Sequence, residues 1–262
     1  MRAAGVVARL RAAGSVWAGE EGALLEAAAT DAADLDALVA RRVAGEPLET
    51  VLGWVEFLGR RLVVAPGVFV PRRRTELLAH TTLRETAARA GHPVVVEMCA
   101  GVAPVAAGLE GADADVHVAD IDASSLGCAT SNAPGATVHR GDLYDALPDR
   151  LRGRVDVLAA NAPYVPTDRI AVLPPEARDH EPRAALDGGA DGVDLQRRIA
   201  AGAPQWLAPG GVLLVETSPG QAHLTTAAME AAGLATSVEV DPEIGGCVAV
   251  GRLTPPAAVE RA

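Results

Sequence analysis

Short apolar runs alternate with amphipathic stretches along most of this chain. Apolar runs bounded by Gly, Pro or Asp predict strands that are buried on both faces of a parallel sheet. They cover about 94–98, 116–120, 136–140, 155–160, 212–216, 235–240 and 246–252. Stretches with apolar residues three or four positions apart predict helices over 123–132, 192–207 and 221–232, besides a short Ala-rich helix after the first strand. This alternation predicts an α/β fold with a doubly wound, mostly parallel sheet whose last strands form an antiparallel edge.

The first part of the chain follows a different pattern. Apolar residues at helical spacings predict several short helices up to about residue 53. The segments 57–64 and 68–70 flank Pro66-Gly67, which predicts a β-hairpin, and a helix follows from about Thr75. We therefore predict a small N-terminal helical domain over 1–54, a β-hairpin linker over 55–74 and the sheet domain over 75–262.

Composition narrows the chemistry that is open to this protein. The sequence contains no Lys, so all 23 basic residues are Arg, and neither a phosphate-loop Lys nor a Schiff-base Lys is available. The net charge of −11 disfavours binding to nucleic acids or anionic membranes, and no apolar run is long enough to span a bilayer. Cys99, Cys128 and Cys247 lack the spacing of metal ligands or redox pairs, so we expect no metal and a cytoplasmic location.

One tetrapeptide, Asn161-Ala162-Pro163-Tyr164, stands directly after the predicted strand 155–160. Ligands of open α/β sheets bind at the carboxyl ends of the strands. An Asn that forms hydrogen bonds, a Pro that fixes the backbone and a Tyr with a flat ring suit a planar amine or amide; a plain strand-to-loop turn is the alternative. The segment that follows, to about Asp191, is rich in Pro and Gly. We interpret it as a loop that covers the substrate, with an unstructured insertion as the alternative.

A second group of positions has the spacing of a nucleotide site. Gly101 follows the first strand of the predicted sheet, and Asp120 ends the next strand nineteen residues later. A Gly at such a turn lets backbone N–H groups approach a ligand, and a carboxylate at about this spacing binds ribose hydroxyls. Asp122 is the alternative carboxylate, or the N-cap of the next helix. Asp142, after the third strand, either positions the base edge of an adenine or caps a helix.

With these positions in place, the chain resembles the class I S-adenosylmethionine (SAM) methyltransferases, and more narrowly the protein N5-glutamine methyltransferases that modify translation release factors. The tetrapeptide stands at the family's Asn-Pro-Pro-Tyr, and the segment 66–76 matches its Pro-Gly-Val…Pro-Arg-x-x-Thr-Glu signature. Two further segments are similar to the family: Gly45-Glu46-Pro47-Leu48 leading into residues 52–57, and His180-Glu181-Pro182 with residues 185–189. The resemblance runs from about residue 40 to the end of the sequence.

The resemblance implies a Rossmann-like class I methyltransferase sheet, SAM as the cofactor and a protein acceptor with an exposed Gln, such as a release factor, without direct contact with nucleic acid or membrane. By position, the cofactor-binding residues are Glu97, Cys99, Ala100, Gly101, Ala103, Asp120, Asp142, Leu143 and Asn161. The catalytic residues are Asn161, Pro163 and Tyr164, and the acceptor also meets Ala162 and His180. The Asn161 side-chain oxygen and the Ala162 carbonyl are expected to accept the two amide protons, and His180 is a candidate general base.

The sequence departs from this family at two sites that bear on function. The family's cofactor loop is usually Asp-x-Gly-x-Gly-x-Gly, whereas residues 97–103 read Glu-Met-Cys-Ala-Gly-Val-Ala. The side chains of Val102 and Ala103 are expected to weaken cofactor binding or to rearrange the loop. Ala162 replaces the first Pro of the tetrapeptide. The alternatives are therefore a methyltransferase of a small natural product or a nucleic-acid amine, and a binding module that has lost catalysis.

Overall fold

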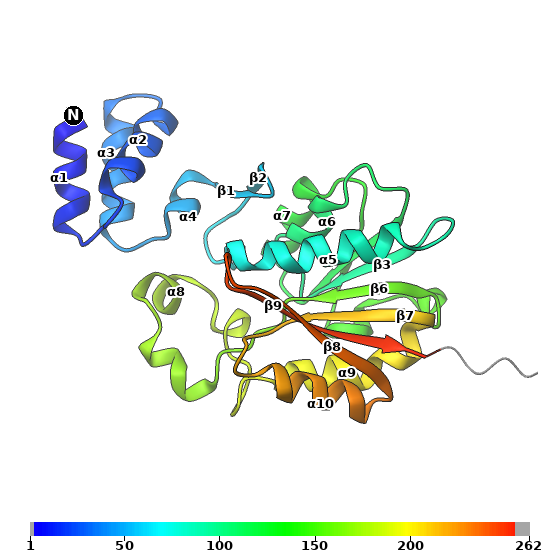
Figure 1. Ribbon diagram of the computed structural model, residues 1–262. Helices are drawn as coiled ribbons and strands as arrows, with labels where there is room; N and C mark the ends of the chain where they lie inside the picture. Colours follow the sequence, from blue (N-terminus) through cyan, green and yellow to red (C-terminus); the bar gives the residue numbers. More distant parts are fainter. Residues whose placement is uncertain (1–2, 255–262) are drawn as a thin grey trace, which may run out of the picture.

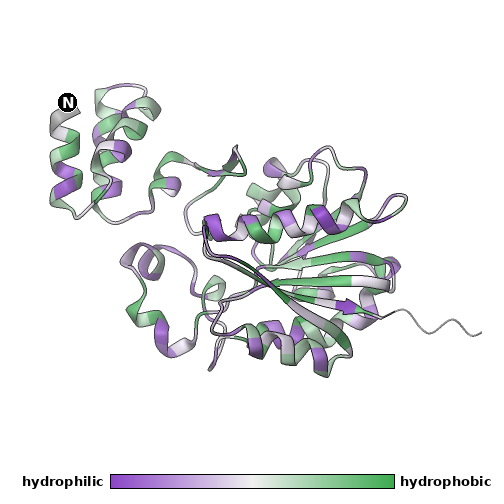
Figure 2. Cartoon of the chain, in the orientation of Figure 1, coloured by the Kyte–Doolittle hydropathy of each residue, from purple (hydrophilic) through white to green (hydrophobic). Residues whose placement is uncertain are grey.

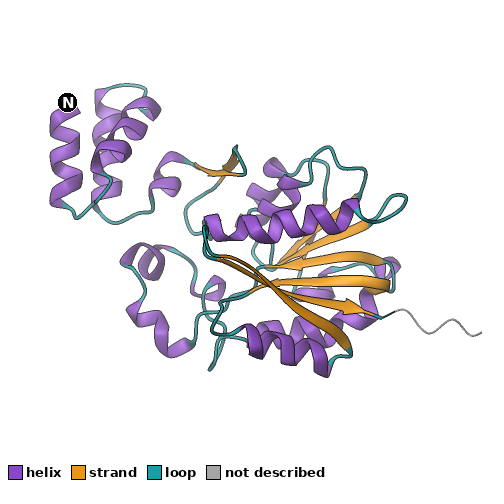
Figure 3. Ribbon diagram, viewed as in Figure 1, coloured by secondary structure: helices purple, strands orange, loops and turns teal. Residues whose placement is uncertain are grey.

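The computed structural model describes residues 3–254 and contains one large sheet. Its strands are β3 Val94–Met98, β4 Asp115–Asp120, β5 Thr137–Arg140, β6 Val155–Ala160, β7 Leu207–Glu216, β8 Leu234–Asp241 and β9 Gly246–Leu253. They lie in the order β5-β4-β3-β6-β7-β9-β8. The strands from β5 to β7 are parallel, and β9 pairs antiparallel with both β7 and β8. The predicted sheet with its antiparallel edge is confirmed (Figure 3).

Helices cover both faces of this sheet (Figure 1). The helices α5 (Glu76–Ala87), α6 (Pro104–Gly108) and α7 (Ala123–Asn132) pack on one face, and α9 (Asp194–Trp206) and α10 (Ala222–Ala231) on the other. Neighbouring side chains of a strand enter different cores: Val95 joins Leu78, whereas Val96 joins Ile199 and Trp206. The strands are hydrophobic along most of their length because both faces are buried (Figure 2).

The hairpin before the sheet lies earlier in the chain than the sequence pattern predicts. The strands β1 (Trp54–Phe57) and β2 (Arg60–Val63) pair antiparallel around Leu58-Gly59. Leu58 and Gly59 have φ angles of 49° and 70°, the left-handed conformations that a two-residue hairpin turn needs. The prediction of a hairpin around Pro66-Gly67 is wrong, because the earlier and shorter turn already brings Phe57 and Leu62 together in the core beside α5.

Helices at the N-terminus pack around a small core of their own. The helices α1 (Ala3–Ala12), α2 (Ala18–Ala28) and α3 (Ala32–Val43) lie apart from the sheet, and α4 (Leu48–Leu52) leads from them into the hairpin (Figure 1). Their common core contains Val6, Leu10, Ala18, Leu25, Leu35, Val39 and Val51. In the part of the chain that the structure describes, no helix is both long enough and apolar enough to cross a membrane.

The segment that follows β6 is folded and not an unstructured insertion. It contains the 3-10 helices Thr167–Val172 and Arg183–Ala185, with the helix α8 (Pro175–His180) between them. Its two ends pair with each other, because the N–H of Val165 donates to the carbonyl of Leu186 and the N–H of Gly188 donates to the carbonyl of Val165. The segment is therefore a closed loop that is anchored at the carboxyl end of β6.

Candidate active site

A cavity of about 690 Å³ opens at the carboxyl ends of β3, β4 and β6. The positions that the sequence singles out meet in its wall: Gly101 after β3, Asp120 at the end of β4, Asp142 after β5, and the tetrapeptide 161–164 after β6. The folded segment after β6 supplies a further part of the wall through Leu173, Pro174, Ala177, Glu181, Pro182 and Leu186. Of the predicted site residues, only Ala103 and His180 do not line this cavity.

Two acidic side chains hold the turn between β3 and α6. Glu97 is buried, and its oxygens accept the N–H groups of Val105 at 3.1 Å and Ala106 at 2.7 Å. Asp120 accepts the N–H of Gly101 through Oδ2 and the N–H of Asp122 through Oδ1, each at 2.8 Å. Burial raises the pKa of Asp120, although both backbone N–H groups favour its ionised form. Asp120 therefore joins the end of β4 to the Gly101 turn, inside the cavity wall.

Two of the three glycines that the family usually has in this turn are replaced, but the backbone conformation of the turn is retained. Cys99, Gly101 and Ala103 have φ angles of 52°, 54° and 61°. All three positions where the family usually has Gly are therefore left-handed, at a cost of about 1–2 kcal/mol for each residue with a side chain. The methyl group of Ala103 is buried in a core beside α7 and α6, away from the cavity. Val102 is also buried, yet it reaches the cavity wall.

The buried Glu97 makes stability depend on pH. Burial raises its pKa from 4.5 to about 8, so between these values the folded chain holds a proton that the unfolded chain has released. The free energy of unfolding should therefore fall on the order of 2 kcal/mol as the pH rises from 6 to 9. Urea unfolding at several pH values measures this slope. Glu97→Gln, which cannot ionise, should flatten it, and equal slopes in both proteins would contradict the assignment.

One hydrogen-bond acceptor of the tetrapeptide, the side-chain oxygen of Asn161, faces the cavity. The Asn161 side-chain nitrogen donates a hydrogen bond to the hydroxyl of Thr75 at 3.3 Å. The Asn161 oxygen accepts no hydrogen bond from residues 3–254, and Asn161 lines the cavity. Ala162 also belongs to the wall, but it is fully buried. In this conformation the Asn161 oxygen is therefore the exposed hydrogen-bond acceptor of the tetrapeptide.

Tyr164 is fixed by a buried carboxylate behind the wall. Its hydroxyl donates to Glu216 Oε1 at 3.2 Å, and Arg74 Nε lies 3.4 Å from the same oxygen. The Arg74 guanidinium also lies over the Tyr164 ring, 5.5 Å from its centre. Burial, with Glu216 close by, raises the pKa of the Tyr164 phenol. The ring is therefore neutral and held in place, which suits packing against a flat group more than acid–base chemistry.

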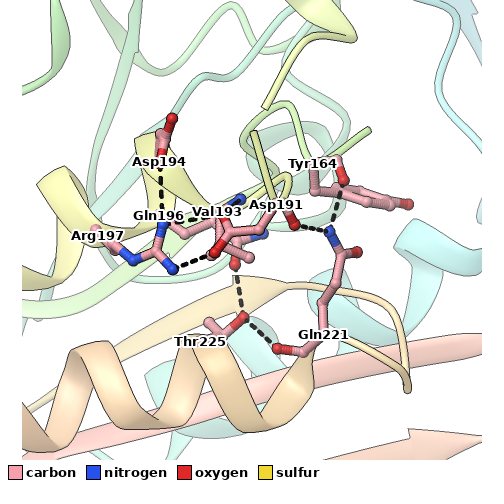
Figure 4. A network of polar contacts seen from close by, with 8 residues as sticks. All are labelled: Tyr164, Asp191, Val193, Asp194, Gln196, Arg197, Gln221 and Thr225. Atoms are coloured by element: carbon pink, nitrogen blue, oxygen red, sulfur yellow. Dashed lines mark hydrogen bonds and ion pairs between the residues drawn. The ribbon is translucent and has the colours of Figure 1, made fainter. Parts of the chain in front are cut away.

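Gln221, at the start of α10, holds the tetrapeptide in place through hydrogen bonds. Its side-chain nitrogen donates to the carbonyl oxygens of Tyr164 and Asp191, at 2.9 and 3.0 Å (Figure 4). Gly192 packs against this contact with a φ of 83°, and a Cβ there would collide with both Gln221 and the Tyr164 carbonyl. The two ends of the folded segment after β6 are thus held to α10 at one point.

Two distant motif segments meet as an ion pair beside the cavity. The buried carboxylate of Glu181 accepts hydrogen bonds from Arg72 through both oxygens, at 2.6 and 2.7 Å. Burial raises the pKa of Glu181, and the charge of Arg72 opposes this rise. The pair joins the folded segment to the residues before α5. His180 lies beside Gly45 instead and does not line the cavity, so this conformation does not bring the candidate base to the acceptor site.

Three residues that hold the site have no individual signal in the sequence pattern. Arg198 in α9 pairs with Asp142 at 2.7 Å, while Thr75 and Gln221 hold the tetrapeptide. Thr75 lies in the segment 66–76 that resembles the family, and this is the one sequence feature that points toward it. Arg198 is 56 positions from Asp142, and Thr75 and Gln221 are 86 and 57 positions from the tetrapeptide residues that they hold. Such separations are beyond the reach of periodicity or local motifs.

The sheet has the fold of the Rossmann-like class I methyltransferases. The crystal structure of a methyltransferase from Pyrococcus furiosus is similar in fold, with a TM-score of 0.56 and 15% identity over 82% of this chain and 97% of that chain. No family model matches the sequence.

Several curated proteins are more similar to this chain in sequence than that methyltransferase is. Release factor glutamine methyltransferases from Geobacter sulfurreducens and Streptomyces coelicolor are 41% and 39% identical over 193 residues, which are 71% and 70% of this chain and 66% and 68% of those proteins. The chain thus spans about two thirds of the length of these curated relatives. A 4-amino-L-phenylalanine/4-methylamino-L-phenylalanine methyltransferase from Streptomyces pristinaespiralis is 36% identical over 74% of this chain and 69% of that protein. This protein belongs to the release factor glutamine methyltransferase family, as its motifs predict.

Proposed function

We propose that this protein transfers a methyl group from SAM to the side-chain amide nitrogen of a glutamine in another protein, a translation release factor. One observation carries the proposal beyond family membership. The free oxygen of Asn161 and the held ring of Tyr164 share a cavity wall with the Gly101 turn and the Asp120 carboxylate. In this proposal, a site for a planar amide and a site for a nucleoside would be adjacent in one cavity.

The residues around the Gly101 turn suit SAM, which when bound supplies an electrophilic methyl group. Each Asp120 oxygen uses one lone pair on a backbone N–H, and the remaining lone pairs would accept the ribose hydroxyls. Asp142 and Leu143 would meet the adenine. Gly101 leaves room for a ligand, since a Cβ placed there would meet no atom within 4 Å.

The acceptor side of the site works by positioning. An amide nitrogen is a weak nucleophile because its lone pair is delocalised, so its orientation and removal from water supply most of the acceleration. Asn161 would accept one amide hydrogen through its side-chain oxygen, and the ring of Tyr164 would pack against the amide plane. Pro163 fixes the turn between them, and the carbonyl of the buried Ala162 is the second proposed acceptor. The nitrogen loses one proton to solvent after transfer, so no protein base is required.

A small aromatic amine is the second candidate acceptor. One relative at 36% identity is named for methylation of 4-amino-L-phenylalanine, and an amine also presents N–H groups to an acceptor such as the Asn161 oxygen. Loss of catalysis is less well supported. The left-handed turn is retained and Asn161 and Tyr164 are both held in the wall.

Mass spectrometry separates these acceptors. The purified protein would be incubated with SAM and a bacterial release factor, and in parallel with SAM and 4-amino-phenylalanine. We expect the mass of one methyl group on a glutamine-containing peptide of the release factor. Methylation of the amine alone would replace the proposed acceptor, and no product in either reaction despite SAM binding would reject both.

The eroded glycine loop yields a separate prediction. Ala103→Gly should change the dissociation constant of SAM by less than about threefold, because the methyl group faces a core and not the cavity. The substitution relieves a left-handed conformation, worth about 1–2 kcal/mol. It also removes a buried methyl group and makes the unfolded chain more flexible, and these losses nearly cancel the gain in the free energy of unfolding. Titration calorimetry and urea unfolding measure both quantities. A tenfold gain in affinity would instead mean that this methyl group obstructs the cofactor.

A further inference from the structure

Arg42, near the end of α3, joins the N-terminal helices to the folded segment after β6. Its Nε and Nη2 donate to the two oxygens of Glu21 in α2, each at 2.9 Å. Its Nη1 lies 2.6 Å from Glu176 in α8. The side chains of Arg42 and Glu21 are each 11% exposed, and that of Glu176 is 48% exposed. Arg42 is thus fixed by a nearly buried partner on one side while it pairs with α8 on the other.

An ion pair with this geometry is stronger than an ordinary surface pair. Exposed ion pairs contribute little, partly because two long side chains lose their freedom when they pair. Arg42 has already lost that freedom to Glu21, and its planar guanidinium presents enough N–H groups for both carboxylates. Glu176 is therefore the one side chain that is newly immobilised when the second pair forms.

The helix α8 depends on contacts of this kind. None of its six residues is buried, so side-chain packing holds it weakly. Glu176 lies in its first turn and pairs with Arg42. At its other end, Nε2 of His180 lies 3.4 Å from the place that a Cβ on Gly45, just after α3, would take. Both ends of α8 therefore contact the region around the end of α3, toward which the helix projects (Figure 1).

Part of the cavity wall belongs to α8, through Glu176 and Ala177. A second hollow of about 240 Å³ lies against the N-terminal helices and shares Glu49 and Glu176 with the cavity. Arg42 lines this second hollow but not the cavity. Any influence of Arg42 on a molecule bound in the cavity must therefore pass through the wall residues that it holds.

We propose that Arg42 and Glu176 are positioning residues whose ion pair fixes α8 and so sets the acceptor side of the cavity. The inference rests on the proposed function, because it takes the segment that starts with the tetrapeptide as the acceptor side. The Gly101 turn and Asp120 belong to β3 and β4, so the ion pair leaves the cofactor side unaffected. The N-terminal helices thus take part in the active site without contributing a residue that reacts.

Hydrogen exchange in α8, followed by NMR, tests the ion pair without any methyl acceptor. Glu176→Gln keeps the shape of the side chain, removes its charge and leaves Arg42 paired with Glu21. Backbone N–H groups that report on this helix belong to Ala177, Arg178 and Glu181. We expect their protection factors to fall about 3- to 10-fold in Glu176→Gln, because local opening of α8 no longer breaks this pair. Unchanged protection would overturn the proposal.

Asp179→Asn is the matched control in the same helix. The Asp179 side chain is 49% exposed, similar to that of Glu176, but its partner is its neighbour Arg178. This variant also replaces a paired carboxylate by an amide, and it leaves the pair between Arg42 and Glu176 intact. We expect protection factors within about twofold of those of the original protein. An equal fall in both variants would assign the effect to the loss of charge in α8 and would overturn the proposal.

Steady-state kinetics with the release factor test the consequence for the acceptor. We expect Glu176→Gln to raise KM for the release factor about 3- to 10-fold, because the fraction of molecules with the acceptor side in place falls. The SAM dissociation constant should stay within about twofold, and kcat should change less than KM. An unchanged KM, or a SAM affinity that falls as far as KM rises, would overturn the positioning role.

Glu176 lines the cavity, so a direct contact with the acceptor must be separated from its effect on α8. Arg42→Gln is made together with Glu21→Gln, which leaves no unpaired buried carboxylate. Adding Arg42→Gln to Glu21→Gln should raise KM as far as Glu176→Gln does, and adding Glu176→Gln to both should raise it no further. A further rise of the same size would assign Glu176 to direct contact with the acceptor and overturn its positioning role.

Hydrogen exchange also keeps this proposal separate from the proposed function. If no glutamine is methylated while protection falls in Glu176→Gln but not in Asp179→Asn, the proposed function fails and the role of the ion pair in fixing α8 stands. If protection does not fall, the proposal is overturned whatever the activity.

Discussion

Replacement of Asn161 by Ala should lower kcat/KM for the glutamine acceptor by about 10²- to 10³-fold, which is typical for loss of one oriented hydrogen-bonding group at a reacting centre. The expectation follows from the wall of the cavity, where the Asn161 oxygen is the exposed acceptor of the tetrapeptide. Without it the amide nitrogen would lose its orientation relative to the methyl group. Initial rates with the release factor, at saturating SAM, measure the loss.

Two controls separate this role from a general collapse of the site. Asn161 is also expected to touch the cofactor, but Asp120 and the Gly101 turn are untouched in Asn161→Ala. Titration calorimetry should therefore show a loss of SAM affinity of no more than about fivefold, far smaller than the loss of kcat/KM. Asn161→Asp keeps an oxygen in the same position and should lose less activity than Asn161→Ala. If Asn161→Ala retained most of the original rate, Asn161 would have no place in the acceptor site.

The parts of the fold that depend on local pattern could be predicted from the sequence. The strand 155–160 is apolar except for Asp156 because both of its faces are buried over most of their length. The tetrapeptide after it is therefore at the carboxyl edge of the sheet, and Asp120 reaches the same edge from β4. Gly101 and Asp120 do join in a hydrogen bond across the nineteen residues between them. The meeting of these residues could be predicted because the carboxyl ends of parallel strands all lie at one edge of the sheet.

The contacts that depend on long-range packing could not be predicted. The hairpin turn lies at Leu58-Gly59 and not at Pro66-Gly67. Either Gly59 or Gly67 could form a turn, and packing decides which of them joins the two strands. Thr75 meets Asn161 from 86 residues away, and Arg72 meets Glu181 from 109 residues away. His180 carries the right chemistry for a base, but it lies against Gly45, outside the cavity.

The backbone conformation of the glycine loop could not be predicted from the sequence either. Only the middle Gly of the family's loop remains in this sequence, and glycine is the residue that readily adopts left-handed backbone, so the side chains at Val102 and Ala103 suggest a changed loop. The structure keeps Cys99 and Ala103 left-handed, and the hydrogen bonds of the loop account for it. Asp120 holds the N–H of Gly101, and Glu97 holds two N–H groups at the start of α6. Several hydrogen bonds of about 1 kcal/mol each can offset the strain at two positions.

Asp120→Asn should weaken SAM binding by about 10²-fold or more, as measured by titration calorimetry. Both carboxylate oxygens of Asp120 accept a backbone N–H and keep a lone pair for a ribose hydroxyl. An amide in its place puts an NH₂ group against one of these donors, and it removes the charge that strengthens the ribose contacts. Charge-assisted hydrogen bonds are worth about 1.5–3 kcal/mol each, so the loss of even one or two accounts for a change of this size.

Asp122 provides the matched control for this prediction. It also lines the cavity, but its carboxylate accepts the N–H of Ser125 at 2.7 Å as the N-cap of α7. Asp122→Ser preserves a capping oxygen and should leave SAM affinity within about threefold; the opposite ranking of the two variants would move the ribose site to Asp122. Because Asp120 also holds the Gly101 turn, unfolding must be compared with and without SAM. A loss of stability that is the same in both conditions would assign Asp120 to the fold, whereas a loss that appears mainly with SAM would assign it to the cofactor.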